Sequence, residues 1–100
     1  MTLKLTAVDQ SPVQGLPVDV SPVALSVELA QACDRLGYHR YWLAEHHNSI
    51  NFAGPCPEIL ISRIASVTER IRVGSGGVML THYSPYKVAE QFSMLETLYP

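Results

Sequence analysis

One stretch decides the fold: Arg40-Tyr41-Trp42-Leu43-Ala44 followed directly by Glu45-His46-His47-Asn48. The aromatic and aliphatic residues of the first part are typical of a buried strand, and the strand ends in a dense polar cluster. Helix-like runs flank it on both sides, with apolar residues at helical spacing over 21–36 and 58–69. A strand between two helices predicts a βαβ unit within a parallel sheet.

Two further strand-like runs, at 3–8 and 71–73, extend this alternation, and a segment at 78–80 also resembles a strand. A third helix is expected to start at Ser84-Pro85. The order β-α-β-α-β-α fits either an open doubly wound sheet or a (β/α)₈ barrel. In both folds ligands bind beyond the carboxyl ends of the strands, which here are Asp9-Gln10-Ser11, Glu45 to Asn48 and Gly74 to Thr81.

Helix boundaries also have sequence signals. Ser21-Pro22 predicts a capped helix start, and Gly37 is placed for a left-handed helix end. Ser84 is expected to cap the third helix in the same way. The stripes expected to pack on the sheet are Leu25, Leu29, Ala32, Cys33 and Leu36; Leu60, Ile61, Ile64, Ala65 and Thr68; and Val88, Phe92, Leu95 and Tyr99.

Composition limits the classes of function. The chain has 100 residues, 47% hydrophobic and 16% charged, with a net charge of −2. It is too apolar for a disordered chain and lacks the basic patch of a nucleic-acid or membrane-surface binder. A spanning segment and a signal peptide are not recognisable, so we expect a cytoplasmic protein. Cys33 and Cys56 are expected to be reduced, buried thiols.

The polar cluster after the central strand is the first candidate for chemistry. Adjacent residues on a strand face opposite sides, so His46 and His47 are not expected to share one ligand. A metal-dependent hydrolase using Glu45, His46, His47 and Asn48 is therefore disfavoured. One histidine is expected to face the site, with Glu45 orienting it or packing below it; the alternative is a pair of surface loop histidines.

The glycine-dense segment Gly74-Ser75-Gly76-Gly77 is the second candidate. It lacks the pattern of a dinucleotide-binding turn and the lysine of a P-loop. Such glycines indicate either a simple turn or a backbone that approaches a flat ligand closely. His82 or Tyr83 is expected to reach the same site from its rim.

Together these motifs resemble the bacterial luciferase-like, flavin-dependent monooxygenases, in the form of their single-chain oxidoreductases. The resemblance covers nearly the whole chain. The residues that carry it are Val8 to Pro12, Leu36 to Asn48, Phe52-Ala53-Gly54, Pro57 to Ile61, Arg70 to Leu80, His82 to Pro85, Lys87 to Phe92 and Leu95-Glu96.

The resemblance implies an α/β fold: the first three βα units of a (β/α)₈ TIM barrel that binds reduced FMN and activates O₂. It implies that Gly76 and Gly77 form a backbone platform for the flavin ring, often through a non-proline cis peptide. Ser75 and Met79 are then expected to contact the flavin beside this platform. His46 matches the family's active-site histidine, which exchanges a proton near neutral pH.

The same resemblance sets expectations for the whole protein. Residues 1–100 correspond to the N-terminal part of the barrel domain, ending before strand four, and the chain alone is not expected to be active. The substrate is a small organic molecule, possibly aldehyde-like; FMN is favoured over deazaflavin, with a flavin reductase as supplier and a homo-oligomer as the full-length form. The alternative is a non-enzymatic truncated or split-gene product that only associates with itself or with a partner fragment. Nucleic acid, membrane and metal are not expected as partners.

Overall fold

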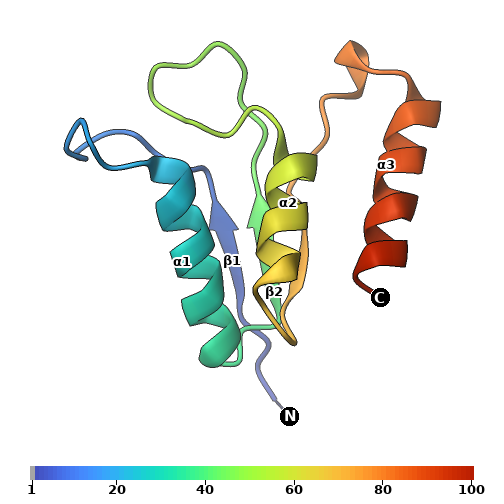
Figure 1. Cartoon of the computed structure of the whole chain (residues 1–100), viewed down its shortest axis with the longest axis horizontal. Helices are drawn as coiled ribbons and strands as arrows, with labels where there is room; N and C mark the ends of the chain where they lie inside the picture. Colours follow the sequence, from blue (N-terminus) through green and yellow to red (C-terminus); the bar gives the residue numbers. More distant parts are fainter. Residues whose placement is uncertain (1) are drawn as a thin grey trace.

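The computed structural model describes residues 2–100 as one parallel three-stranded sheet with helices between the strands. The elements in chain order are β1 (Thr6–Asp9), α1 (Pro22–Arg35), β2 (Arg40–Leu43), α2 (Pro57–Ser66), β3 (Arg72–Ser75), the 3₁₀ helix η1 (Leu80–His82) and α3 (Pro85–Leu98). Figure 1 shows α1 and α2 side by side against the sheet, with α3 standing apart from them. The predicted α/β class and the parallel strand order β1-β2-β3 are confirmed.

Helices cover one face of the sheet, and the other face is open. Alternation along β2 directs Tyr41 and Leu43 toward the helices, where both are fully buried. Trp42 points to the opposite face and remains 38% exposed. The core lies between β2 and the helices and consists of Ala30, Cys33, Tyr41, Leu43, Leu60, Ile61, Ile64 and Ile71. One face of the sheet is therefore packed, and the other is open.

The predicted helix signals are confirmed at α1 but not at α3. The Ser21 hydroxyl accepts a hydrogen bond from the Ala24 amide at 3.2 Å, and Gly37 follows the helix with a φ of 82°. Ser84 occupies the N-cap position of α3 with an extended backbone, but its side chain makes no capping hydrogen bond. The start of α3 is fixed instead by Pro85, whose ring favours the first helical position.

The buried face of α1 differs from the predicted stripe. Leu29 is 50% and Leu36 is 76% exposed, whereas the polar residues Ser26 and Asp34 are buried beside Ala30 and Cys33. Hydrophobic spacing misses such a face because Ser26 and Asp34 are buried through hydrogen bonds rather than apolar contact. Cys33 is buried as expected, but Cys56 is exposed; both are free thiols.

Asp34 also explains why α2 ends early. The helix was predicted to reach Glu69 but ends at Ser66. The Asp34 carboxylate accepts hydrogen bonds from three successive amides, at 2.8 Å from Glu69, 3.0 Å from Arg70 and 2.9 Å from Ile71. These amides are thereby satisfied outside a helix, and the chain enters β3 directly from this turn.

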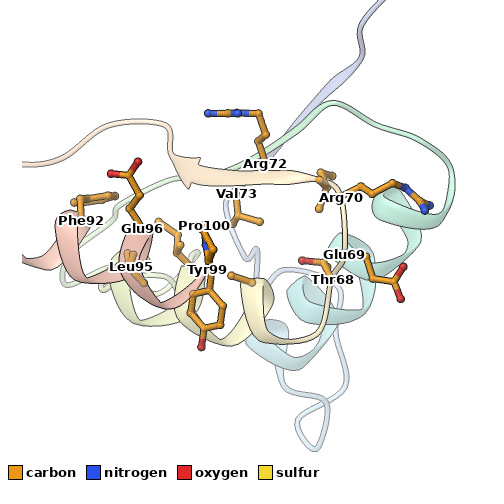
Figure 2. A pocket seen from close by; sticks show the side chains of 13 residues that line it. Thr68, Glu69, Arg70, Arg72, Val73, Phe92, Leu95, Glu96, Tyr99 and Pro100 are labelled. Carbon is orange, nitrogen blue, oxygen red and sulfur yellow. The ribbon is translucent and has the colours of Figure 1, made fainter.

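Each outer strand has a free edge. Within residues 2–100, β1 pairs only with β2, and so does β3. Beside β3 lies a groove of about 520 Å³ between this strand, α2 and α3, and Figure 2 shows Val73, Leu95 and Tyr99 around it. No helix in this part of the chain is long and apolar enough to cross a lipid bilayer.

Candidate functional site

The carboxyl ends of the strands and the loops that follow them lie at the same end of the molecule, at the top of Figure 1. Backbone contacts tie two of these loops together. The Val13 amide donates to the Asn51 carbonyl at 2.8 Å, and the Ala53 amide donates to the Ser11 carbonyl at 2.9 Å. The long loop after β2 therefore takes its position from the segment that leaves β1.

His46 is held by this loop. Its ring stacks on Phe52 with a centroid distance of 4.4 Å, and its amide donates to the Gly54 carbonyl at 3.0 Å. Its Nε2 atom is the only buried side-chain nitrogen or oxygen among residues 2–100 that lacks a hydrogen-bond partner. Buried polar atoms are normally satisfied, so this nitrogen is suited to a partner supplied by a ligand.

Glu45, His47 and Tyr83 form a separate hydrogen-bonded trio. Nε2 of His47 lies 2.5 Å from a carboxylate oxygen of Glu45, and the Tyr83 hydroxyl donates to that same oxygen at 2.7 Å. The chain has left β2 at this point, and the contacts separate the two histidines: the His47 ring meets Glu45, whereas the His46 ring lies against Phe52. Glu45 thus orients a histidine as expected, but that histidine is His47. Tyr83 reaches the site from the rim, as predicted.

Two members of the trio, Glu45 and Tyr83, have a defined charge state at neutral pH. Burial alone would raise the pKa of Glu45, but the hydrogen bonds from His47 and Tyr83 and from the Met79 amide outweigh burial and hold that pKa below its ordinary value. The hydrogen bond to Glu45, together with burial and the nearby carboxylate charge, raises the pKa of Tyr83 to about 12. At neutral pH the site therefore holds an ionised Glu45 beside a neutral Tyr83.

The glycine segment lies directly against the end of β2. The Gly76 amide donates to the Leu43 carbonyl at 2.8 Å, which continues the β2–β3 ladder by one residue. Gly76 and Gly77 are both exposed, neither has a positive φ, and a Cβ placed on Gly77 would meet nothing within 4 Å. Within this chain, neither conformation nor crowding requires glycine at position 77. That is the pattern expected where a backbone must stay clear for a ligand.

Ser75 makes two hydrogen bonds within the glycine segment. Its hydroxyl donates to the Gly77 carbonyl and accepts from the Gly77 amide at 3.3 Å. The expected non-proline cis peptide is wrong: every peptide bond between the described residues is trans. The trans form is favoured by about 3 kcal/mol for such bonds, and nothing in this chain opposes it.

The expectation of strand structure at 78–80 is also wrong. Met79 precedes η1, and the turn is closed by the His82 amide, which donates to the Met79 carbonyl at 2.9 Å. The Met79 amide instead faces Glu45, at 3.5 Å from its second carboxylate oxygen. Met79 itself is 46% exposed beside the glycine segment, and the His82 ring approaches His47 edge-on.

A buried polar network below the site was not predicted. The Tyr41 hydroxyl donates to the Asp9 carboxylate, whose other oxygen accepts from the Ser11 amide at 2.8 Å. The Ser11 and Ser26 hydroxyls lie 2.7 Å apart. Burial and the adjacent Asp9 raise the pKa of Tyr41 well above its usual range. The sequence held one signal for this network, which is the charged residue Asp9. Alternation along β1 places Asp9 on the same, helix-facing side as Ala7.

Parallel strands joined through helices, with polar side chains at their carboxyl ends, are the arrangement of the βα folds that bind ligands at this end of the sheet. The profile of the luciferase-like monooxygenases matches residues 3–100. The chain belongs to that family, as its sequence motifs predicted.

Known relatives agree with this assignment. The chain is 47% identical to the N-acetyl-S-alkylcysteine monooxygenase of Bacillus subtilis (strain 168) over 98 residues, covering 98% of this chain and 29% of the relative. It matches the crystal structure of apo-MsnO8 with 56% identity and a TM-score of 0.91, over 99% of this chain and 30% of that one.

A second solved structure shows the fold alone, because only 20% of its residues are identical. It is the oxygenating constituent of 3,6-diketocamphane monooxygenase from Pseudomonas putida in complex with FMN, with a TM-score of 0.88 over 98% of this chain and 27% of that protein. This chain therefore spans about 30% of the length of such relatives.

Proposed function

We propose that this chain is the N-terminal part of a flavin-dependent monooxygenase domain that uses reduced FMN and O₂. The observation that carries the proposal is the pairing of two features at one edge of the sheet. They are the unpartnered Nε2 of His46 and the open backbone at Gly76 and Gly77. A flat, polar ligand satisfies both.

These residues fit a flavin in distinct roles. Gly76 and Gly77 would support the ring through their backbone, since no side chain there blocks a planar group. Ser75 holds the platform in shape, and Met79 borders it with a half-exposed side chain. Bound reduced flavin would supply the electrons for O₂ activation. His46 would serve as the catalytic residue that holds or releases a proton at Nε2.

The rest of the proposal concerns the longer protein. The substrate would be a small organic molecule, and an aldehyde is the first candidate. The second candidate is a thioether, because a 47% identical relative is an N-acetyl-S-alkylcysteine monooxygenase. A flavin reductase would supply reduced FMN in the cytoplasm, and free thiols at Cys33 and Cys56 are consistent with that compartment. The exposed Ile59 and Met94 border a groove between α2 and α3 and support a homo-oligomer.

The test uses a chimera in which this chain replaces the matched 98 residues of the Bacillus subtilis monooxygenase. Titration with FMN in air, and with reduced FMN under anaerobic conditions, would be followed by flavin fluorescence or absorbance. We expect the chimera to bind flavin and Gly77→Val to weaken binding at least about tenfold, while His46→Ala binds flavin but loses turnover. Equal flavin affinity for the parent and Gly77→Val would contradict the platform.

A second candidate is a non-enzymatic product that only associates with itself or with a partner fragment. The free edges of β1 and β3 favour it, because unpaired strands are templates for further pairing. The chimera with the Bacillus subtilis monooxygenase discriminates the two, because both candidates allow the 100-residue chain alone to associate without binding flavin. A chimera that binds flavin and turns over reduced FMN would exclude this candidate, whereas a folded chimera that does not bind flavin would support it.

A further inference from the structure

The open face of the sheet carries basic side chains at its amino-terminal end. Arg40 and Arg72 are directly paired in the β2–β3 register, so their side chains leave the sheet next to each other on one face. Figure 2 shows the Arg72 side chain on the side of β3 opposite to Tyr99 and Leu95. Lys4 precedes β1 by two residues and also lies near this end.

The pKa of His39 is independent evidence that these positive charges lie close together. Burial lowers the pKa of His39, and the neighbouring charges of Lys4, Arg40 and Arg72 lower it further. Like charges directly opposite each other on neighbouring strands are destabilising. We refer to Lys4, Arg40 and Arg72 as the basic row.

Nothing in this part of the chain neutralises the basic row. Across residues 2–100 the only contact within 4.0 Å between a basic side chain and a carboxylate is that of the His47 ring with Glu45, so no carboxylate lies within this distance of Arg40 or Arg72. Yet the chain as a whole has nine acidic and seven basic residues. The acidic residues therefore lie elsewhere, while the basic row faces the open side.

The neighbourhood of the basic row indicates what covers it. Trp42, two residues after Arg40, and Val8, in the next strand, share the open face with 38% and 62% exposure. In the barrel fold of the family this face points inward and is packed by side chains of the other strands. Arginines enclosed there without partners would be strongly unfavourable, whereas bidentate pairing with carboxylates satisfies their donors.

We infer that the basic row is an interaction surface for carboxylate side chains on the strands that complete the barrel. The partner is thus a polypeptide of further βα units with an acidic residue opposite each arginine, at the end of the barrel away from His46. This inference rests on the barrel fold and not on flavin binding. It assigns Arg40 and Arg72 a role in assembly of the domain.

The test compares how the same two substitutions shift the urea midpoint of the 100-residue chain and that of the chimera, where we expect shifts in opposite directions. In the 100-residue chain, Arg40→Gln/Arg72→Gln removes like-charge repulsion, and we expect a higher urea midpoint. In the chimera with the Bacillus subtilis monooxygenase, the same pair of substitutions leaves buried carboxylates unpaired, and we expect a lower midpoint. Arg35→Gln, on the exposed end of α1, is the matched control and should leave both midpoints unchanged. Midpoints that shift in the same direction in both contexts would overturn the inference.

A second measurement does not require a folded chimera. The 100-residue chain is mixed with the part of the Bacillus subtilis enzyme that follows its matched region, and association is measured by calorimetry without flavin. We expect Arg40→Gln/Arg72→Gln to weaken association at least about tenfold, and Arg35→Gln to have no effect. Equal affinities of the parent chain and the double variant for the fragment would refute a carboxylate-binding role. Loss of flavin binding with this association intact would count against the proposed function alone.

Discussion

Glu45→Gln offers a direct test of the hydrogen-bonded trio at the candidate site. In the wild-type chain Glu45 accepts a hydrogen bond from Tyr83 and places a negative charge beside it, which raises the pKa of Tyr83 from 10.0 to about 12. The neutral amide of Gln removes that charge, so the pKa should return toward 10.0. At pH 11, Tyr83 would then change from about one-tenth to about nine-tenths ionised, for a shift of this size.

The assay is the absorbance of tyrosinate after a rapid jump in pH, with circular dichroism used to confirm that the fold persists. The difference between Glu45→Gln and wild type isolates Tyr83, because the other four tyrosines are common to both proteins. Tyr83→Phe should abolish the difference, and Glu28→Gln, on the exposed side of α1, should not produce it. Superimposable absorbance curves between pH 10 and pH 12 would refute the argument, because Glu45 would then not control the hydroxyl.

Three further predictions concern stability. Asp34→Asn retains one acceptor oxygen and should lower the free energy of unfolding by about 2 kcal/mol in urea denaturation. Asp34→Ala leaves the amides of residues 69–71 without an acceptor and should lower that free energy by about 3 kcal/mol or more. Because folding holds the pKa of Asp34 below 3.8, ionised Asp34 contributes its full share of the folding stability above pH 3.8, and this share is lost as the pH falls further. The stability of Asp34→Asn should not show this loss at low pH. Tyr41→Phe removes the donor to buried Asp9 and should cost about 2 kcal/mol, against no change for the exposed Tyr86→Phe in the same denaturation series. Gly37→Ala, at a φ of 82°, should lower the thermal midpoint through a loss of about 1 kcal/mol; an unchanged midpoint would contradict the left-handed helix end.

The sequence predicted well what depends on local pattern. Strand and helix order, the cap at Ser21 and the glycine helix end follow from alternation, periodicity and turn chemistry, which involve only near neighbours. The alternation of strands and helices also predicted that ligands bind at the carboxyl ends of the strands, and the family resemblance added the flavin and the role of His46. Tyr83, one of the two residues expected at the rim, reaches Glu45 from the turn that follows β3.

The remaining differences arise from polar contacts between distant residues. Asp34 ends α2 from 35 positions away, and buried Ser26 replaces the leucines expected on the inner face of α1. The residues expected to form a strand at 78–80 lead instead into η1, where the His82 amide donates to the Met79 carbonyl and the Met79 amide faces Glu45. Hydrophobic spacing carries no information on such contacts, since a buried carboxylate and an exposed one have the same sequence pattern.

The two adjacent histidines illustrate how tertiary contacts divide neighbouring residues between tasks. His46 depends on Phe52, and Phe52 is bridged to Pro12, so the exit of β1 determines where the unpartnered nitrogen lies. His47 depends on Glu45 and on Tyr83, which arrives from beyond β3. Each outer strand therefore controls one histidine of the central strand. Because Gly76 and Gly77 also follow β3, the three-stranded sheet and its loops fix the positions of both histidines relative to this glycine segment.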